Sequence, residues 1–430
     1  MPDRAAYPEL QGAVPLSASS PALARALTPW TLGPLQLRNR VIKAATNEGM
    51  AIGMRPSQAL VEHHRAIARG GAGLTTVAYC AVERDGRTFP DQLVLAPENL
   101  AALAVLTAAV HAEGGAVSAQ ITHGGAFNFL SEMEHGTVWS ASGGLNPMGF
   151  LQGRLFKKAM TRAAMTQIRD AFVAGARLAR QAGFDAVEIH MGHGYLLSQF
   201  LSPKYNHRKP PYGGDAAARA RFPCEVLAAV RDAVGDTTGV ACKLSMFERW
   251  SQRGQVDAAL TVAQRLQASG AHLLVLSAGM NVEAPWAIFG SRLPPSATRG
   301  AGTLLLRAAG WMVQRQQPKI VYEDLYLLPS ARQMRAGLSL PLAYLGGVRS
   351  VADIETVMRE GFDAVVMGRA LLHDPDLLRH FREGEVRRSG CTTCNECVGT
   401  MYGPAGTHCV LTQQGDVCLR RTPVLPPPDM

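Results

Sequence analysis

The sequence predicts an α/β fold, a (β/α)8 TIM barrel with additions at both ends, and three observations lead to this prediction. Eight apolar runs typical of buried strands begin near residues 41, 73, 116, 185, 239, 272, 341 and 363. Segments of helical pattern separate them, which calls for a parallel sheet, and eight such units favour closure into a barrel. The 430 residues suit one barrel with extensions, and a hydrophobic content of 47% can fill a large core.

Composition divides the chain into three parts. Residues 1–27 are rich in Ala, Pro and Ser and are expected to form a flexible leader. Residues 28–390 are expected to form the barrel, and residues 391–430 a Cys-rich tail. The leader lacks the apolar segment of a signal peptide, and no apolar run reaches the roughly 20 residues that span a bilayer. We therefore expect a cytoplasmic protein without a membrane segment.

The formal net charge of +9 suits an anionic ligand. Lys and Arg are scattered among acidic residues, and no basic surface interleaved with aromatic residues is evident, so we expect no nucleic-acid partner. A small-molecule substrate and a homo-oligomeric state are expected instead.

The first barrel strand is expected at residues 41–46 and leads directly to Asn47, whose amide can donate a hydrogen bond. The helix that follows contains His63 and His64, which we interpret as surface or packing residues. A glycine-rich turn then leads into the second strand, which contains Tyr79.

The third strand is expected at residues 116–125, with the polar Gln120 near its end. After it, residues 127–158 form a long irregular segment rich in Gly, Asn and Pro. Irregular segments of this length are uncommon unless they are functional, so we expect a lid or rim there.

The prediction of function depends on the stretch from Asp185 to Pro203, which begins with the fourth strand. Its apolar run ends at His190, and glycines then separate His193 from Tyr195. Three hydrogen-bonding side chains are thus gathered at the C-terminal end of a strand, where β/α barrels carry out chemistry.

The fifth strand, residues 239–245, contains Lys243, an ammonium that is costly to bury without an anionic partner. A core salt bridge with Glu188 is one explanation, because Glu188 shares a strand face with His190. Glycine turns follow strands seven and eight, where barrels often bind phosphate through backbone N–H groups. The turn residues are Gly346, Gly347, Gly368 and Arg369.

The run from Glu188 to His190, the run from His193 to Pro203, and the later Asn206, Arg208 and Tyr212–Gly214 resemble the old yellow enzyme family of FMN-dependent reductases. The resemblance covers roughly residues 27–390. It implies that NAD(P)H reduces FMN, which then reduces an α,β-unsaturated carbonyl compound. His190 and His193 would bind the carbonyl oxygen, and Tyr195 would donate the proton.

The same resemblance implies a set of flavin contacts. Lys243 would lie beside flavin N1 and the C2 carbonyl, as an alternative to a purely structural ion pair, and the two glycine turns would bind the FMN phosphate. The expected contacts are Ala45, Asn47, Tyr79, Gln120, Lys243, Gly346, Gly347, Gly368 and Arg369.

The tail contains a C-x2-C-x2-C-x11-C pattern formed by Cys391, Cys394, Cys397 and Cys409. Cysteines in a chain without a secretory signal favour metal or redox use over a disulfide framework. The spacing resembles the [4Fe–4S] site of the dienoyl-CoA reductase and trimethylamine dehydrogenase branch. Structural zinc and the absence of any metal remain alternatives. The main effect of an iron–sulfur cluster here would be on stability or on exchange with a separate electron-transfer protein.

Two rival functions remain open at this point. The same flavin scaffold could dehydrogenate or demethylate amines, which no sequence feature excludes. A metal protein without flavin is the other rival, but two imidazoles without a nearby carboxylate make a poor catalytic zinc site.

Overall fold

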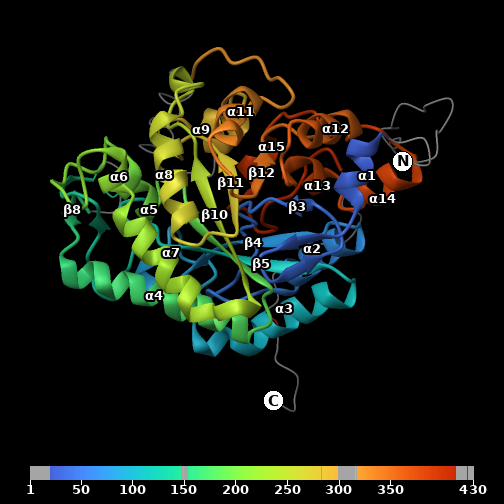
Figure 1. Cartoon of the computed structure of the whole chain (residues 1–430). Coiled ribbons are helices and arrows are strands. Elements are labelled where there is room, and N and C mark those ends of the chain that lie inside the picture. Colours follow the sequence, from blue (N-terminus) through green and yellow to red (C-terminus); the bar gives the residue numbers. More distant parts are fainter. Residues whose placement is uncertain are drawn as a thin grey trace.

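Eight parallel strands close into a barrel, as the sequence predicted, and helices surround it (Figure 1). The computed structural model describes residues 20–146, 149, 154–281, 283–298, 315, 317–412 and 424. The order around the barrel is β10-β11-β12-β13-β3-β4-β5-β9, so each strand follows its predecessor in the chain. The strands are β3 (Val41–Lys43), β4 (Leu74–Ala81), β5 (Ala116–Thr122), β9 (Ala186–Met191), β10 (Gly239–Ser245), β11 (Leu273–Ser277), β12 (Leu342–Leu345) and β13 (Ala364–Met367).

The helices pack an apolar face against these strands. In α4, for example, Ile168, Phe172, Ala176 and Ala179 are buried at helical spacing. Ser57 and Thr161 cap the N-termini of α2 and α4 through their hydroxyl oxygens. The helices are α1 (Pro21–Leu27), α2 (Gln58–Arg69), α3 (Leu100–Ala112), α4 (Arg162–Gln181), α5 (Leu196–Leu201), α6 (Ala216–Arg219), α7 (Arg221–Val234), α8 (Asp257–Ala268), α9 (Pro285–Phe289), α11 (Leu328–Ala336), α12 (Val351–Arg359), α13 (Arg369–His373), α14 (Leu377–Glu383) and α15 (Glu396–Thr400).

The end of the barrel at which the strands begin is apolar and closed. A hairpin of β1 (Trp30–Leu32) and β2 (Leu35–Leu37) packs its buried residues into one cluster with Ile42, Leu74 and Val366. This hairpin leaves the C-terminal ends of the strands as the end of the barrel where polar groups can gather.

Two expectations about the connecting segments need correction. Residues 21–27 were expected to belong to the flexible leader, but they form α1, whose Leu23 and Ala26 are buried and which packs against α12 (Figure 1). The segment 127–158 is not wholly irregular, because β6 (Trp139–Ser140), β7 (Gly144–Leu145) and β8 (Phe156–Ala159) form a small sheet. Its role as a lid or rim remains a prediction.

The described part of the tail packs against the barrel, and the rest of the expected leader and tail lies outside the described residues. The division at residues 28–390 and 391–430 therefore remains a prediction. Among the described helices, none has the length and hydropathy needed to cross a membrane.

Candidate active site at the barrel mouth

The structure brings His190, His193 and Tyr195 together at the end of β9. The ring centroid of His190 lies 5.0 Å from that of His193 and 4.5 Å from that of Tyr195. The chain reverses sharply between them, with φ of 60° at His193 and 88° at Gly194. Glycine adopts such an angle without strain at position 194, whereas His193 adopts one that non-glycine residues rarely show.

Hydrogen bonds fix the orientation of both imidazoles. His190 Nδ1 accepts the N–H of Gly192 at 3.2 Å, which leaves the proton of the neutral ring on Nε2. His193 Nε2 lies 2.7 Å from the hydroxyl of Ser277, and the His193 N–H donates to Ser245 Oγ at 3.2 Å. Ser245 and Ser277 end β10 and β11, so neighbouring strands hold the turn after β9 in place.

Burial keeps these three side chains uncharged near neutral pH. It lowers the pKa of His190 well below its usual value, with His193 and Lys243 adding to the effect. Burial and Lys243 lower the pKa of His193 to about 3. Burial also raises the pKa of Tyr195 above its usual value. The imidazoles can therefore donate hydrogen bonds as neutral groups, and the phenol retains its proton.

Aromatic rings line one side of the site. The Tyr195 ring lies 5.1 Å from Tyr79 and 5.4 Å from Phe127, centroid to centroid. The Tyr79 hydroxyl pairs with Thr88 Oγ1 at 2.6 Å. Phe127 and Thr88 were not among the predicted site residues, because nothing in their local sequence marks them.

The predicted flavin contacts Gln120 and Lys243 share one carboxylate at the base of the site. Gln120 Nε2 donates to Glu188 Oε1 at 2.6 Å, and Lys243 Nζ lies 3.3 Å from the same oxygen. Lys243 Nζ also donates to the carbonyl of Ala45 at 3.4 Å. The ion pair with Glu188, proposed as the structural alternative, is thus present. A contact between Lys243 and flavin remains a prediction beside it.

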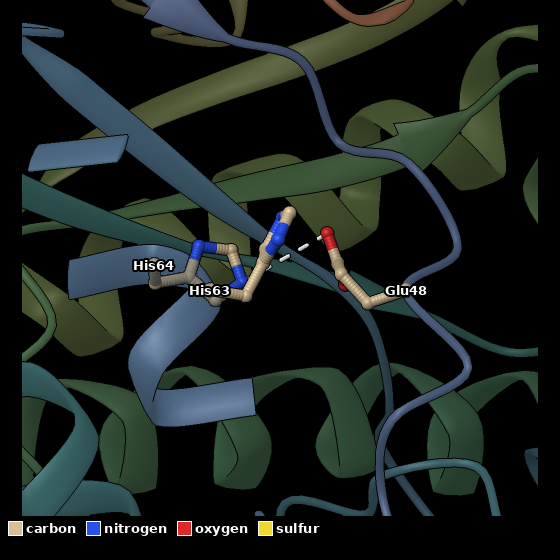
Figure 2. Close-up of side chains that lie close together, drawn as sticks. All are labelled: Glu48, His63 and His64. Carbon is tan, nitrogen blue, oxygen red and sulfur yellow. Dashed lines mark ion pairs between the residues drawn. The ribbon is translucent and has the colours of Figure 1, made fainter. Parts of the chain in front are cut away.

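A second buried ion pair, between Lys43 and Glu48, lies next to the first and was not predicted. Glu48 Oε2 accepts the Ala78 N–H at 2.8 Å, which ties the chain that follows β3 to the middle of β4. Glu48 faces His63 and His64, and the three offer ligand atoms within 4.8 Å of one another (Figure 2). Because the Lys43 ammonium already neutralises the carboxylate, this group does not suit a metal cation. His64 is buried and His63 half-buried, and their interpretation as surface or packing residues remains a prediction.

The glycine turns after β12 and β13 present backbone donors. Within the described part of the chain, the N–H groups of Gly346, Gly347 and Gly368 donate to no acceptor. The side chain of Arg369 donates to the Phe289 carbonyl at 2.9 Å and to Asn395 Oδ1. The predicted arginine therefore reaches toward the tail.

Unpartnered donors also lie near each end of the expected flavin site. The Asn47 amide nitrogen is buried without an acceptor among the described residues. The Tyr322 hydroxyl is likewise buried without a partner there, and it lies 3.1 Å from where a Cβ on Gly347 would lie. Donors at both ends fit an elongated ligand with a polar ring and an anionic group, as FMN is. Tyr322 was missed because it comes from the connection 280–335, where the sequence offered no motif.

The four cysteines of the spacing pattern, Cys391, Cys394, Cys397 and Cys409, are all described, whereas Cys418, the fifth cysteine of the tail, lies outside the described residues. Burial raises the pKa of Cys397 to about 11; Arg369 lowers it, and Cys391, Cys409 and Cys394 raise it further. Cys391 and Cys409 are buried, Cys397 is half-buried, and Cys394 is exposed. His373 Nδ1 lies 3.4 Å from Cys409 Sγ. The spacing pattern therefore does correspond to one cluster of side chains.

The sequence of the chain is similar to those of known oxidoreductases. The model of the NADH:flavin oxidoreductase / NADH oxidase family matches residues 26–285, and the model of the dihydrouridine synthases matches residues 311–403. A 4,4'-dithiodibutanoate disulfide reductase from Rhodococcus erythropolis is 40% identical over 390 residues, covering 89% of this chain and 94% of the relative. An NADH oxidase from Thermoanaerobacter brockii is 29% identical, and its match covers 86% of this chain but 52% of that protein.

Solved structures share the fold at low identity. A 2-naphthoyl-CoA reductase superposes with a TM-score of 0.72 at 22% identity, covering 91% of this chain and 57% of the other. The old yellow enzyme homologue from Zymomonas mobilis superposes with a TM-score of 0.66 at 21% identity, covering 86% and 95%. The chain thus spans 94% and 95% of the two shorter proteins and 52% and 57% of the two longer ones.

Proposed function

Because the chain belongs to the NADH:flavin oxidoreductase / NADH oxidase family and is an FMN-dependent oxidoreductase, we propose that it uses NAD(P)H to reduce an α,β-unsaturated carbonyl compound. The observation that carries the proposal is the meeting of two neutral imidazoles and a protonated phenol at the end of β9. Bound FMN supplies hydride chemistry at the barrel mouth.

We assign binding of the carbonyl oxygen to His190 and His193. His190 carries its proton on Nε2, which has no partner among the described residues, so it can donate to an oxygen in the pocket. His193 is held by Ser277 through Nε2, which leaves Nδ1 for the ligand. Two neutral donors polarise the alkene and stabilise enolate charge as it develops, without transferring a proton to the oxygen.

Tyr195 is assigned the protonation of the carbon next to the carbonyl. Its raised pKa keeps the phenol protonated across the neutral range, and its ring lies against that of His190. Proton donation by a positioned acid contributes about 10²–10⁴-fold to such a step. Asn47, Gln120, Lys243 and the two glycine turns would hold the FMN.

The test separates the two half-reactions. Tyr195→Phe should lower reduction of an enone about 10²–10⁴-fold, and His190→Ala about 10²–10³-fold, as for the loss of one oxyanion donor. Reduction of the flavin by NAD(P)H, followed by its bleaching in a stopped-flow instrument, should change far less in both variants. Equal losses in both half-reactions would contradict the assigned roles.

Two other substrates belong in the same assay. The relative that is 40% identical carries the name of a disulfide reductase, and its match covers almost its full length. A symmetric organic disulfide is therefore the second candidate substrate. Tertiary amines test the dehydrogenation alternative. If Tyr195→Phe still reduces the disulfide and the wild type reduces no enone, disulfide reduction replaces enone reduction as the proposed function.

For the tail we propose a [4Fe–4S] cluster held by Cys391, Cys394, Cys397 and Cys409. The C-x2-C-x2-C-x11-C spacing of these residues supports a cluster. Four thiolates also suit zinc, with Zn–S bonds of about 2.3 Å, so metal analysis separates the two. Anaerobic purification should yield about four irons and four sulfides per chain; one zinc instead would contradict the proposal.

A further inference from the structure

The loop between the third and fourth tail cysteines, residues 398–408 and here called the tail loop, lies directly against the chain that follows β3. The Thr407 N–H donates to the carbonyl of Glu48 at 2.7 Å, and its hydroxyl donates to the carbonyl of Asn47 at 2.5 Å. A Cβ on Gly49 would lie 2.0 Å from the Met401 carbonyl oxygen. The two backbones are therefore in contact at two separate points.

Hydrogen bonds within the tail loop close it on itself. Thr400 Oγ1 donates to the carbonyl of Cys397 at 2.8 Å and accepts the His408 N–H at 3.1 Å. The Gly403 N–H donates to the Thr400 carbonyl at 2.8 Å, and the Gly406 N–H donates to the Gly403 carbonyl at 3.1 Å. These bonds give the loop a defined shape, so the side chain at its tip has a defined position.

Tyr402 lies at that tip, in contact with the aromatic side of the candidate active site. Its ring meets the Phe89 ring edge to face at 5.5 Å. Phe89 in turn lies 6.1 Å from Tyr79, which lies 5.1 Å from Tyr195. Tyr402 also adds to the rise in the pKa of Tyr195, which indicates that the two phenols are close.

Tyr402 is 59% exposed as a whole residue, in contrast to Tyr79 and Tyr195 at 6% and 5%. Its hydroxyl end is more enclosed, because burial raises the pKa of this phenol above its usual value. A small recess, partly open to solvent, borders Phe89 and is also lined by Asn47, Gly49 and Tyr79. Tyr402 packs on one lining residue, and Met401 touches another. An exposed aromatic ring at the edge of such a recess offers its face to a planar ligand.

We propose that Tyr402 forms the outer wall of the substrate pocket and determines the preference for unsaturated carbonyl compounds with a planar aromatic substituent. This inference rests on the proposed function, which places the carbonyl group at His190 and His193. A substituent that extends from that position past Tyr195 and Tyr79 arrives at Phe89 and Tyr402. The tail thus has a direct contact with substrate in addition to the binding of a metal by its thiols.

The test uses two ketones that share the same enone, benzylideneacetone with a phenyl group and ethylideneacetone with a methyl group. Their dissociation constants are measured from the change that they cause in the flavin absorption of the oxidised holoenzyme. Tyr402→Ala should weaken binding of benzylideneacetone about three- to tenfold, the worth of one aromatic contact, and leave ethylideneacetone within about twofold. Tyr402→Phe should retain both affinities, because it keeps the ring.

Leu411→Ala provides the matched control, because Leu411 is an exposed apolar residue of the same tail beyond Cys409. It should leave both affinities unchanged. An unchanged ratio of the two affinities in Tyr402→Ala, or an equal loss in Leu411→Ala, would overturn the inference. If the wild type binds both ketones and reduces neither, the proposed function is wrong. The ratio of the two ketone affinities in Tyr402→Ala still decides the role of Tyr402 in that case. Binding of neither ketone by the wild type overturns both.

Discussion

The barrel mouth and the cysteine tail gather reactive side chains in opposite ways. At the mouth, Gln120, Glu188 and Lys243 come from three neighbouring strands, and strand register holds them in place. In the tail, all four thiols come from residues 391–409, where the described helix is α15, five residues long. The comparison teaches that strand pairing alone can build the mouth, whereas the tail depends on side-chain contacts and on what its thiols bind.

The largest effect is expected from breaking the buried ion pair at the mouth. Lys243 and Glu188 are 1% and 4% exposed. Lys243→Met leaves an uncompensated buried carboxylate, so the free energy of unfolding should fall by about 3–5 kcal/mol. Denaturant unfolding measures the loss. The double variant Lys243→Met/Glu188→Leu should recover most of the stability, since a well-packed apolar pair is often neutral. A loss below about 1 kcal/mol in the single variant would contradict this prediction. It would show that the arrangement of the strands at the mouth does not depend on the ion pair between Lys243 and Glu188.

A smaller effect is expected from acid. Burial lowers the pKa of His64 and of His190 well below the value in the unfolded chain, so the unfolded state binds more protons below about pH 6.5. The stabilisation is fully present above that pH and is lost as the pH falls, by up to about 1.4 kcal/mol per pH unit for each histidine. Unfolding between pH 7 and 5, with FMN in excess, measures the slope.

Two variants sharpen this measurement. His64→Gln should reduce the acid slope, because it removes one of the histidines whose pKa burial lowers, which also include His63 and His193. His135→Gln serves as the matched control at an exposed histidine. A slope that His64→Gln does not reduce would contradict the assignment.

The smallest effect on the barrel is expected from the tail. Cys397→Ser should lower the iron content sharply, yet it should change the free energy of unfolding of the barrel by less than about 1 kcal/mol, because the substitution touches no barrel strand. Iron analysis and denaturant unfolding on one sample decide this. If the barrel is destabilised as much as by Lys243→Met, the two regions are not independent.

The sequence was sufficient for the strands and for the residues that end them, because apolar runs and strand ends are local signals. It missed α1 although Ser20 and Pro21 are a typical helix start. The Ala- and Pro-rich composition concealed that signal. The pair Lys43–Glu48 was also missed, since a lysine in a short apolar run does not reveal its partner.

Tyr322 and Tyr402 could not have been predicted from local sequence. Each reaches the mouth from a segment without a regular element, and only tertiary packing brings it there. The resemblance to a known family was weakest in the connection that carries Tyr322, and it gave the tail no role beyond its thiols.

One side chain joins the two regions, and its position has a thermodynamic consequence. Arg369 begins helix α13 at the end of the turn expected to bind the flavin phosphate, and its guanidinium donates to Asn395, which lies between Cys394 and Cys397. A ligand that orders Arg369 from the phosphate side would therefore also order the cysteine segment. Free-energy linkage would make this effect reciprocal: whatever factor the cofactor adds to the affinity of the thiols for the proposed metal, that metal would add to the affinity for the cofactor. Incorporation of either one would favour incorporation of the other during assembly of the holoenzyme.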